Sequence, residues 1–242
     1  MKKLLLYFMA MASLVACEND SYDTGTGTYS LMTGDLVEVV TNSDAYITSF
    51  VTDDDTKYSL TSYIKTDWAM VGDSTYRALL YYNLEDNGYA EAVSISEIPV
   101  LTLYIADSLE TVYTDPVNLE SIWMSKNGKY VNLGLYVKTG VSDDIIDYQS
   151  VAMLYSGTSY NEDGTNTINL TFYHDQGDVP EYYSSKYYFS LRTSNLKVAV
   201  PDSSSLSTFN SQLSTSYVLA DSVSITINTY SDGIVTKTLA ID

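Results

Sequence analysis

Short runs in which apolar and polar side chains alternate are the feature that most limits how this chain can fold. The runs at 131–138, 168–173, 187–192 and 223–228 each place an apolar residue at every second position. This period of two is typical of half-buried β-strands. Beyond residue 17 no segment sustains a helical period, and the chain is rich in Tyr, Thr and Val, which favour strands. The sequence therefore predicts an all-β fold.

Glycine-containing turn signals separate the predicted strands. Asn127-Gly128 and Asp232-Gly233 are dipeptides typical of tight hairpins, in which both central residues adopt positive φ. Asn87-Gly88 and the segment 161–164 separate two further pairs of runs in the same way. Short strands with regularly spaced turns indicate a β-sandwich or a β-barrel.

A break near residues 103–118 divides the predicted strands into two groups. Asp115-Pro116 interrupts the strand pattern there, because proline cannot donate to a sheet. We predict a small OB-like β-barrel domain at 29–105, then a β-sandwich domain at 106–242 with a long Ser-rich loop at 201–215. The five barrel strands are expected at 29–40, 44–52, 57–64, 75–85 and 89–102.

The N-terminal residues predict an export signal. Lys2 and Lys3 precede a mostly apolar stretch at 4–15, which is shorter than the roughly 20 residues that span a bilayer and fits a signal peptide. The stretch ends in four residues that resemble a bacterial lipobox: Leu14, Val15, Ala16 and Cys17. We therefore predict a lipoprotein signal peptide at 1–16, recognised by the signal peptidase through the three residues before the cysteine.

The lipobox resemblance implies that Cys17 carries a diacylglyceryl group on its sulfur and an acyl group on its new amine. The alternative is an ordinary signal peptide with a chance cysteine. Glu18, Asp20 and Asp23 follow and resemble the acidic export signal of Bacteroidota lipoproteins, although a solvated acidic tether explains them equally well. We predict a lipidated, flexible tether at 17–28 and an outer-membrane location. The sequence does not decide whether the protein faces the cell surface or the periplasm.

Charge and rare residue types exclude several functions. The chain has 31 acidic and 12 basic side chains, a net charge of −19, so it lacks the basic face that nucleic-acid binding needs. One cysteine excludes a disulfide scaffold, and a single histidine leaves no zinc ligand set. His174 is expected to be a hydrogen-bonded residue on the core side of a strand. A Ser-His-Asp triad around it stays open, but the chain has no G-x-S-x-G motif.

Acidic clusters are interpreted mainly as solvated charge that keeps the protein soluble. They are 53–55, then Asp143, Asp144 and Asp147, then Asp175, Asp178 and Glu181. A glycan hydrolase would need two such carboxylates across a cleft. The segment 161–164 resembles part of an EF-hand loop, but Leu170 stands where the final glutamate is required. A loose Ca²⁺ site remains open; we predict no metal site and no cofactor besides the lipid.

Tyrosine doublets are the candidate binding residues. In a strand, one ring of each doublet points away from the core. Outward rings can stack on sugars or contact a protein partner, although Tyr also simply fills strand positions that face water. The cluster that we single out for ligand binding is Tyr182, Tyr183, Tyr187 and Tyr188.

The order of several short motifs is similar to that of the NigD-like lipoproteins of Bacteroidota. They are 76–84 (YRALLYYNL), 98–102 (IPVLT), 115–117 (DPV), 122–124 (IWM), 130–133 (YVNL), 170–175 (LTFYHD), 188–191 (YFSL) and 223–230 (VSITINTY). The resemblance implies an N-terminal OB-like domain and a C-terminal β-sandwich, in agreement with the strand count. It carries no established catalytic residues to transfer.

These observations favour a non-enzymatic, lipid-anchored binding or accessory module that contacts the membrane through its lipid and binds an unknown envelope protein or glycan. The alternatives are an envelope immunity or stress-protection protein and, ranked last, a glycan hydrolase that uses paired carboxylates.

Overall fold

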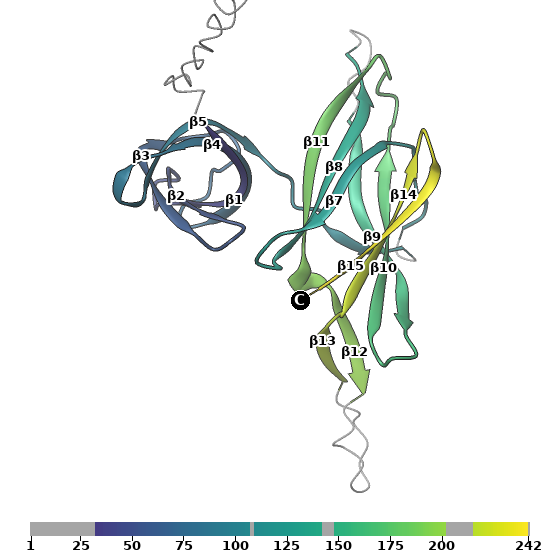
Figure 1. The fold of residues 1–242 in the computed structure, drawn as a ribbon. Coiled ribbons are helices and arrows are strands. Elements are labelled where there is room, and N and C mark those ends of the chain that lie inside the picture. Colours follow the sequence, from purple (N-terminus) through teal and green to yellow (C-terminus); the bar gives the residue numbers. More distant parts are fainter. Residues whose placement is uncertain (1–31, 107–108, 142–147, 202–214, 242) are drawn as a thin grey trace, which may run out of the picture. The chain divides into compact units, whose positions relative to one another are not determined.

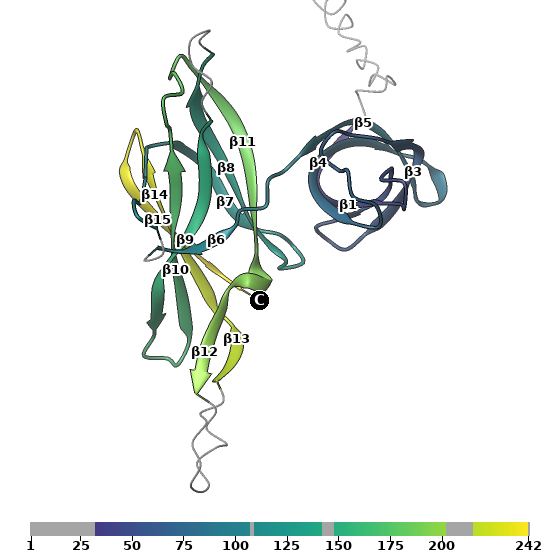
Figure 2. The same ribbon diagram turned by 180° about the vertical axis from the view of Figure 1, so that it is seen from behind.

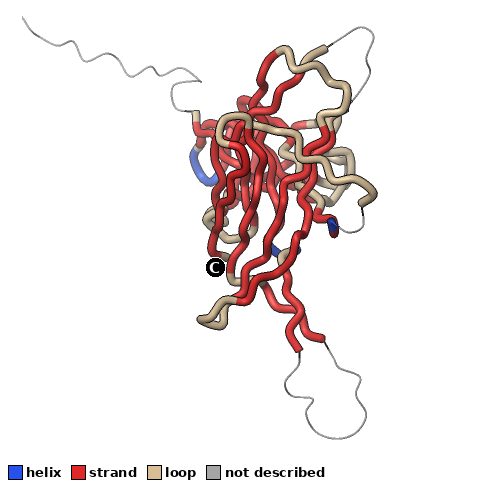
Figure 3. Tube along the Cα trace, turned by 90° about the vertical axis from the view of Figure 1, so that its right-hand side faces the viewer, coloured by secondary structure: helices blue, strands red, loops and turns tan. Residues whose placement is uncertain are grey.

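The computed structural model describes residues 32–106, 109–141, 148–201 and 215–241, and residues 33–242 form one compact unit. Strands dominate the described part (Figure 3). The predicted all-β fold, a small barrel followed by a sandwich, is confirmed. The part of the chain that the structure describes contains no helix with the length and hydropathy to cross a membrane.

The first five strands close into a barrel (Figure 1). They are β1 (Thr33–Thr41), β2 (Ile47–Thr52), β3 (Lys57–Ile64), β4 (Thr75–Leu84) and β5 (Tyr89–Glu97). Their order around the barrel is β1-β2-β3-β5-β4, and β1 pairs with β4 to close it. The β3–β5 pair is parallel and the other pairs are antiparallel. This order is that of an OB-type barrel.

The barrel core follows from the period of two. Along β1, Val37 and Val39 are fully buried, whereas the residues between and beside them are only partly covered. Ile47, Phe50 and Leu80 come from neighbouring strands and are also fully buried. One face of each strand therefore fills the interior, and the other carries outward side chains such as Arg77 of β4.

The C-terminal domain is a sandwich of two main sheets (Figures 1 and 2). One sheet has the order β15-β14-β10-β9-β6 and the other has the order β11-β8-β7, and β12 pairs with β13 as a separate ribbon. The strands are β6 (Leu103–Ile105), β7 (Asn118–Met124), β8 (Tyr130–Thr139), β9 (Ser150–Tyr160), β10 (Asn166–Asp175), β11 (Tyr183–Arg192), β12 (Lys197–Pro201), β13 (Thr215–Leu219), β14 (Ser222–Thr229) and β15 (Gly233–Ala240).

Side chains from both sheets fill the sandwich core. Leu133 and Leu135 of β8 face Leu170 and Phe172 of β10, and all four are at most 2% exposed. Two pairings were not expected from the sequence, because β14 pairs in parallel with β10 and β6 pairs in parallel with β9. Strand β6 belongs to the sandwich, although the boundary predicted after residue 105 leaves it with the barrel.

The four predicted turns connect neighbouring strands. Asn87 and Gly88 both have positive φ (63° and 81°), as do Gly128 (68°), Gly164 (86°) and Gly233 (67°). Asn127 and Asp232 do not have positive φ, so the prediction of positive φ at both central residues is wrong for these two hairpins. Glycine meets this conformation without the strain that a Cβ would add. The predicted signal peptide, Cys17 and the tether lie outside the described residues, as do Asp143, Asp144, Asp147 and most of the predicted 201–215 loop.

Candidate functional site

A buried arginine stands where the outer surface of the barrel meets the three-stranded sheet. Arg77 points outward from β4, and its guanidinium donates to both carboxylate oxygens of Asp53, at 2.6 and 2.7 Å. The Arg77 side chain is fully buried and that of Asp53 is 19% exposed. Such a bidentate, charge-assisted pair fixes both side chains in one geometry.

The same guanidinium reaches polar side chains of the sandwich. It donates to Asn132 Oδ1 on β8 at 3.2 Å, and its Nε donates to Ser190 Oγ on β11 at 3.3 Å. The Ser190 hydroxyl in turn donates to Asn132 Oδ1 at 2.8 Å. Asn132 and Ser190 are both fully buried. Because a buried charge is costly without partners, these contacts keep the two domains joined here.

Tyr130 extends this network. Its ring lies under the Arg77 guanidinium, with 4.3 Å from the guanidinium carbon to the ring centre, a cation–π geometry. Its hydroxyl donates to Glu38 of β1 at 2.7 Å. Burial, and then this hydrogen bond, raise the pKa of the Tyr130 hydroxyl above its usual value. The phenol therefore stays neutral and acts as a donor.

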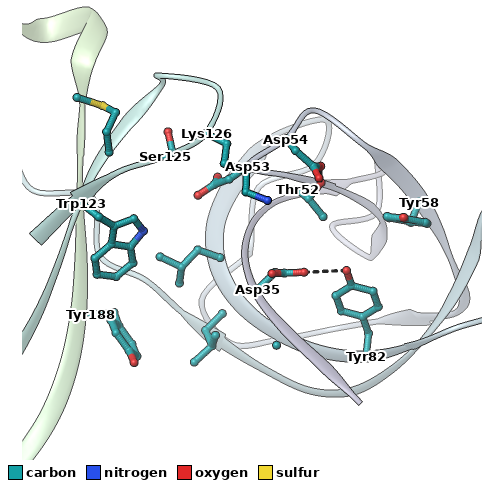
Figure 4. Close-up of a pocket in the computed structure, with 14 residues that line it drawn as sticks. Asp35, Thr52, Asp53, Asp54, Tyr58, Tyr82, Trp123, Ser125, Lys126 and Tyr188 are labelled. Atoms are coloured by element: carbon teal, nitrogen blue, oxygen red, sulfur yellow. Dashed lines mark hydrogen bonds between the residues drawn. The ribbon is translucent and has the colours of Figure 1, made fainter. Parts of the chain in front are cut away.

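A cavity of about 400 Å³ opens beside this network (Figure 4). This volume lies within the range of small-ligand sites. Its walls come from β1, β2, β3, β4, β7 and β11 and from the turns that follow β2 and β7. The lining residues are Gly34, Asp35, Leu36, Thr52, Asp53, Asp54, Tyr58, Leu79, Tyr82, Trp123, Met124, Ser125, Lys126 and Tyr188.

Aromatic rings occupy two sides of the cavity (Figure 4). Trp123 and Tyr188 come from the sandwich and meet edge to face, with ring centres 6.2 Å apart. Tyr58 and Tyr82 come from the barrel and pack against Phe50, with ring centres 5.3 and 4.8 Å from it. The barrel rings are thus held by the core, whereas Trp123 and Tyr188 stand on the outer face of a sheet.

Three carboxylates line the cavity, and each accepts hydrogen bonds from the chain itself. Asp53 is held by Arg77, and Asp35 Oδ2 accepts from the Tyr82 hydroxyl at 2.8 Å. Asp54 Oδ1 accepts from the Thr52 hydroxyl and from the Thr56 backbone amide.

These contacts also determine the protonation states of Asp54 and Tyr82. The hydrogen bonds of Thr52 and Thr56 hold the pKa of Asp54 below its ordinary value. Burial, and then the bond to Asp35, raise the pKa of Tyr82 above its ordinary value. Near pH 7, Asp54 is thus an ionised acceptor and Tyr82 is a neutral phenol.

The structure separates the four tyrosines singled out from the sequence. Tyr188 lines the cavity, whereas Tyr187 lies beside Phe189, with ring centres 6.3 Å apart. Tyr182 and Tyr183 are 71% and 53% exposed and do not line the cavity. One of the four therefore contributes to the site that the geometry defines.

His174 is buried in β10, as the sequence predicts. Its Nδ1 lies 3.0 Å from the Asp115 carbonyl oxygen, and its Nε2 is buried without a hydrogen-bond partner among the described residues. No group of three or more His, Cys, Asp or Glu side chains within the described ranges is arranged to hold a metal ion. In the 161–164 turn, Asp163 accepts from the Thr165 amide and hydroxyl, as in an Asx-type turn.

Several site residues were missed or misread from the sequence. Asp53 was taken as solvated charge with its neighbours, yet it pairs with a fully buried arginine. Trp123 appeared only within the IWM motif, and Asp35 was not singled out. The alternation of apolar and polar residues along β7 and β11 could have placed Trp123 and Tyr188 on the outward faces of their strands. No local sequence signal shows that both rings line the same cavity.

Comparison with known proteins agrees with this architecture. Residues 101–215 match the family model described as the NigD-like C-terminal beta sandwich domain. A NigD-like immunity protein from Bacteroides caccae is similar in structure, with a TM-score of 0.59 and 18% identity over 87% of this chain and 97% of that one. A predicted lipoprotein from Bacteroides fragilis gives a TM-score of 0.55 and 11% identity over 87% and 98%. No curated protein matched the sequence.

The fold defines a class of protein, a two-domain all-β chain with an OB-like barrel and a β-sandwich. Residues 101–215 therefore match a NigD-like C-terminal beta sandwich domain, which confirms the resemblance seen in the sequence. At 18% and 11% identity the solved structures establish the shared fold alone.

Proposed function

We propose that this protein is a lipid-anchored, non-enzymatic binding module of the cell envelope, attached to the outer membrane through Cys17. The observation that carries the binding role is the cavity, where aromatic walls meet carboxylates that the chain itself holds in place. Rigid aromatic and polar groups of this kind suit recognition more than proton transfer. The lipobox at 14–17 and the lipoprotein among the structural neighbours support the anchor.

Cys17→Ser tests the anchor. The wild-type protein should incorporate a palmitate analogue and sediment with outer membranes, because two or more acyl chains hold a protein stably. The variant should incorporate no label and be lost from the outer-membrane fraction. Palmitate label in the variant, or an unlabelled variant that still sediments with outer membranes, would contradict the lipid anchor. Protease treatment of intact cells then decides between the surface and the periplasmic face.

A second candidate function is protection of the envelope, as an immunity or stress protein. The name of the Bacteroides caccae neighbour favours it. A deletion strain should then become more sensitive to bacteriocins or to envelope stress, and the gene supplied in trans should restore resistance. Unchanged sensitivity would leave only the binding role.

A further inference from the structure

We infer that the cavity binds a neutral oligosaccharide, with Trp123 and Tyr188 as its aromatic platform; this deepens the proposed binding function and rests on it. The two rings come from β7 and β11 and meet edge to face at 87°, so their planes face different directions. Aromatic faces of this size provide apolar contact area for the C–H faces of sugar rings. Figure 4 shows both rings on the same side of the cavity, opposite Tyr58 and Tyr82.

The polar groups around the platform suit hydroxyl groups. Asp35 Oδ2 accepts from the Tyr82 hydroxyl, whereas Asp35 Oδ1 has no hydrogen bond among the contacts of the described residues. Asp54 accepts from Thr52 and Thr56. The Trp123 indole N–H and the Lys126 ammonium group are donors at the same cavity, likewise without a described hydrogen bond. A sugar hydroxyl donates and accepts at once, so a polyol can satisfy both kinds of group.

Charge decides against ionic ligands. The chain as a whole carries −19, whereas the cavity lining, with Asp53 paired to Arg77, keeps two carboxylates and one ammonium group, a net charge of −1. Arg77 neutralises Asp53 by its bidentate contact, and Lys126 stands with the two remaining carboxylates, Asp35 and Asp54. An anionic ligand would meet these carboxylates, and a cationic ligand would meet Lys126. A neutral ligand avoids both costs.

The platform continues along the outer face of the three-stranded sheet. Trp123 is opposite Asn132 of β8, Tyr188 is opposite Gly134, and Tyr136 follows on the same face of β8. Tyr136 is 37% exposed. A Cβ at Gly134 would lie 2.7 Å from Ser121 Oγ, 2.9 Å from Glu120 Oε2 and 3.3 Å from the Tyr188 ring, so only glycine fits here. The Lys186 ammonium group lies 4.8 Å from the centre of the Tyr188 ring. A row of rings indicates a chain of several sugars rather than a single one.

Tryptophan fluorescence reports on this site directly. The chain has two tryptophans, and Trp68 packs against Tyr76 in the barrel, away from the cavity lining. In a Trp68→Phe background, Trp123 is the single reporter. The full lipidated protein, in a zwitterionic detergent without sugar headgroups, is titrated with neutral hexasaccharides of glucose, mannose, galactose and N-acetylglucosamine. Their monosaccharides, a tri-lysine peptide and a sulfated hexasaccharide form the other arms.

We expect at least one neutral hexasaccharide to change Trp123 fluorescence saturably and to bind at least about tenfold more tightly than its monosaccharide. Tyr188→Ala should weaken that binding by about tenfold or more, because truncating a central aromatic anchor is costly. Lys126→Ala, an exposed substitution that leaves the fold intact, should weaken it severalfold. Tyr182→Ala is the matched control and should leave the affinity unchanged.

Three outcomes would overturn the inference: no response to any neutral hexasaccharide, a response confined to the tri-lysine or sulfated ligand, or equal losses in Tyr188→Ala and Tyr182→Ala. A saturable ionic ligand lost in Lys126→Ala would leave the proposed binding function intact with another ligand class. A Trp123 signal that responds to no arm would remove the binding function as well, while the Cys17 experiment judges the anchor separately.

Discussion

The guanidinium carbon of Arg77 lies 4.3 Å from the centre of the Tyr130 ring, and each residue also binds a carboxylate of the barrel, Asp53 and Glu38 respectively. Arg77 belongs to β4 and Tyr130 to β8, so this contact joins the barrel to the sandwich. A buried cation here has an aromatic face, a bidentate carboxylate and two polar side chains as partners. The stability of the junction should therefore depend on each partner.

Asp53→Asn should destabilise the protein strongly. It removes the charge that compensates the fully buried Arg77, and breaking a buried pair in this way costs about 3–5 kcal/mol. Asp55→Asn is the matched control, because its partner Lys129 is 47% exposed and such surface pairs contribute at most about 1 kcal/mol. Urea unfolding followed by circular dichroism measures both. Equal losses in the two variants would refute a structural role for the buried pair.

Alkaline pH should lower the free energy of unfolding, because the partly buried Tyr230 has a raised pKa. Burial, and then the hydrogen bond to Glu181, raise the pKa of Tyr230 to about 12. Its folded pKa exceeds the unfolded value of about 10, so its contribution is complete below pH 10 and is lost as the pH rises toward 12. In Tyr230→Phe, a pH titration followed by phenolate absorbance should show one fewer tyrosine with a raised pKa. An unchanged number of such groups would contradict the raised pKa of Tyr230.

Two substitutions at His174 distinguish packing from hydrogen bonding. The ring is fully buried, makes one described hydrogen bond to the Asp115 carbonyl and packs against Phe172. His174→Phe keeps the ring and loses that bond, at about 1 kcal/mol. His174→Ala leaves a cavity and should cost about 2–5 kcal/mol. Thermal unfolding of the two variants side by side tests this order; a reversed order would show that the imidazole's polar contacts dominate.

Gly72→Ala should destabilise the barrel. A Cβ at this position would lie 2.4 Å from the Ser43 carbonyl oxygen and 2.8 Å from its carbonyl carbon. Because both atoms belong to the backbone, the loop before β4 must move, and forced overpacking costs about 1–3 kcal/mol. The midpoint of urea unfolding measures the loss. An unchanged midpoint would mean that this loop shifts freely.

Local patterns predicted the elements well because they depend on neighbours in sequence. Alternating burial along β1 and the positive φ of Gly128 and Gly233 both follow from short-range rules. The site could not be predicted in this way. Arg77 and Ser190 are 113 positions apart, so only closure of both domains brings them within 3.3 Å. Asp53 is likewise indistinguishable from Asp54 and Asp55 until its partner is known.

The short connection between the two domains has a kinetic consequence. Only residues 98–102 separate β5 from β6, and they are bonded to both sides: the Ile98 amide donates to the Arg77 carbonyl at 2.9 Å and the Ser190 amide donates to the Pro99 carbonyl at 3.0 Å. So short a tether keeps the effective concentration of one domain near the other high. If the junction opens transiently, it should close again faster than a ligand at ordinary concentrations could arrive, so the cavity meets its ligand already assembled.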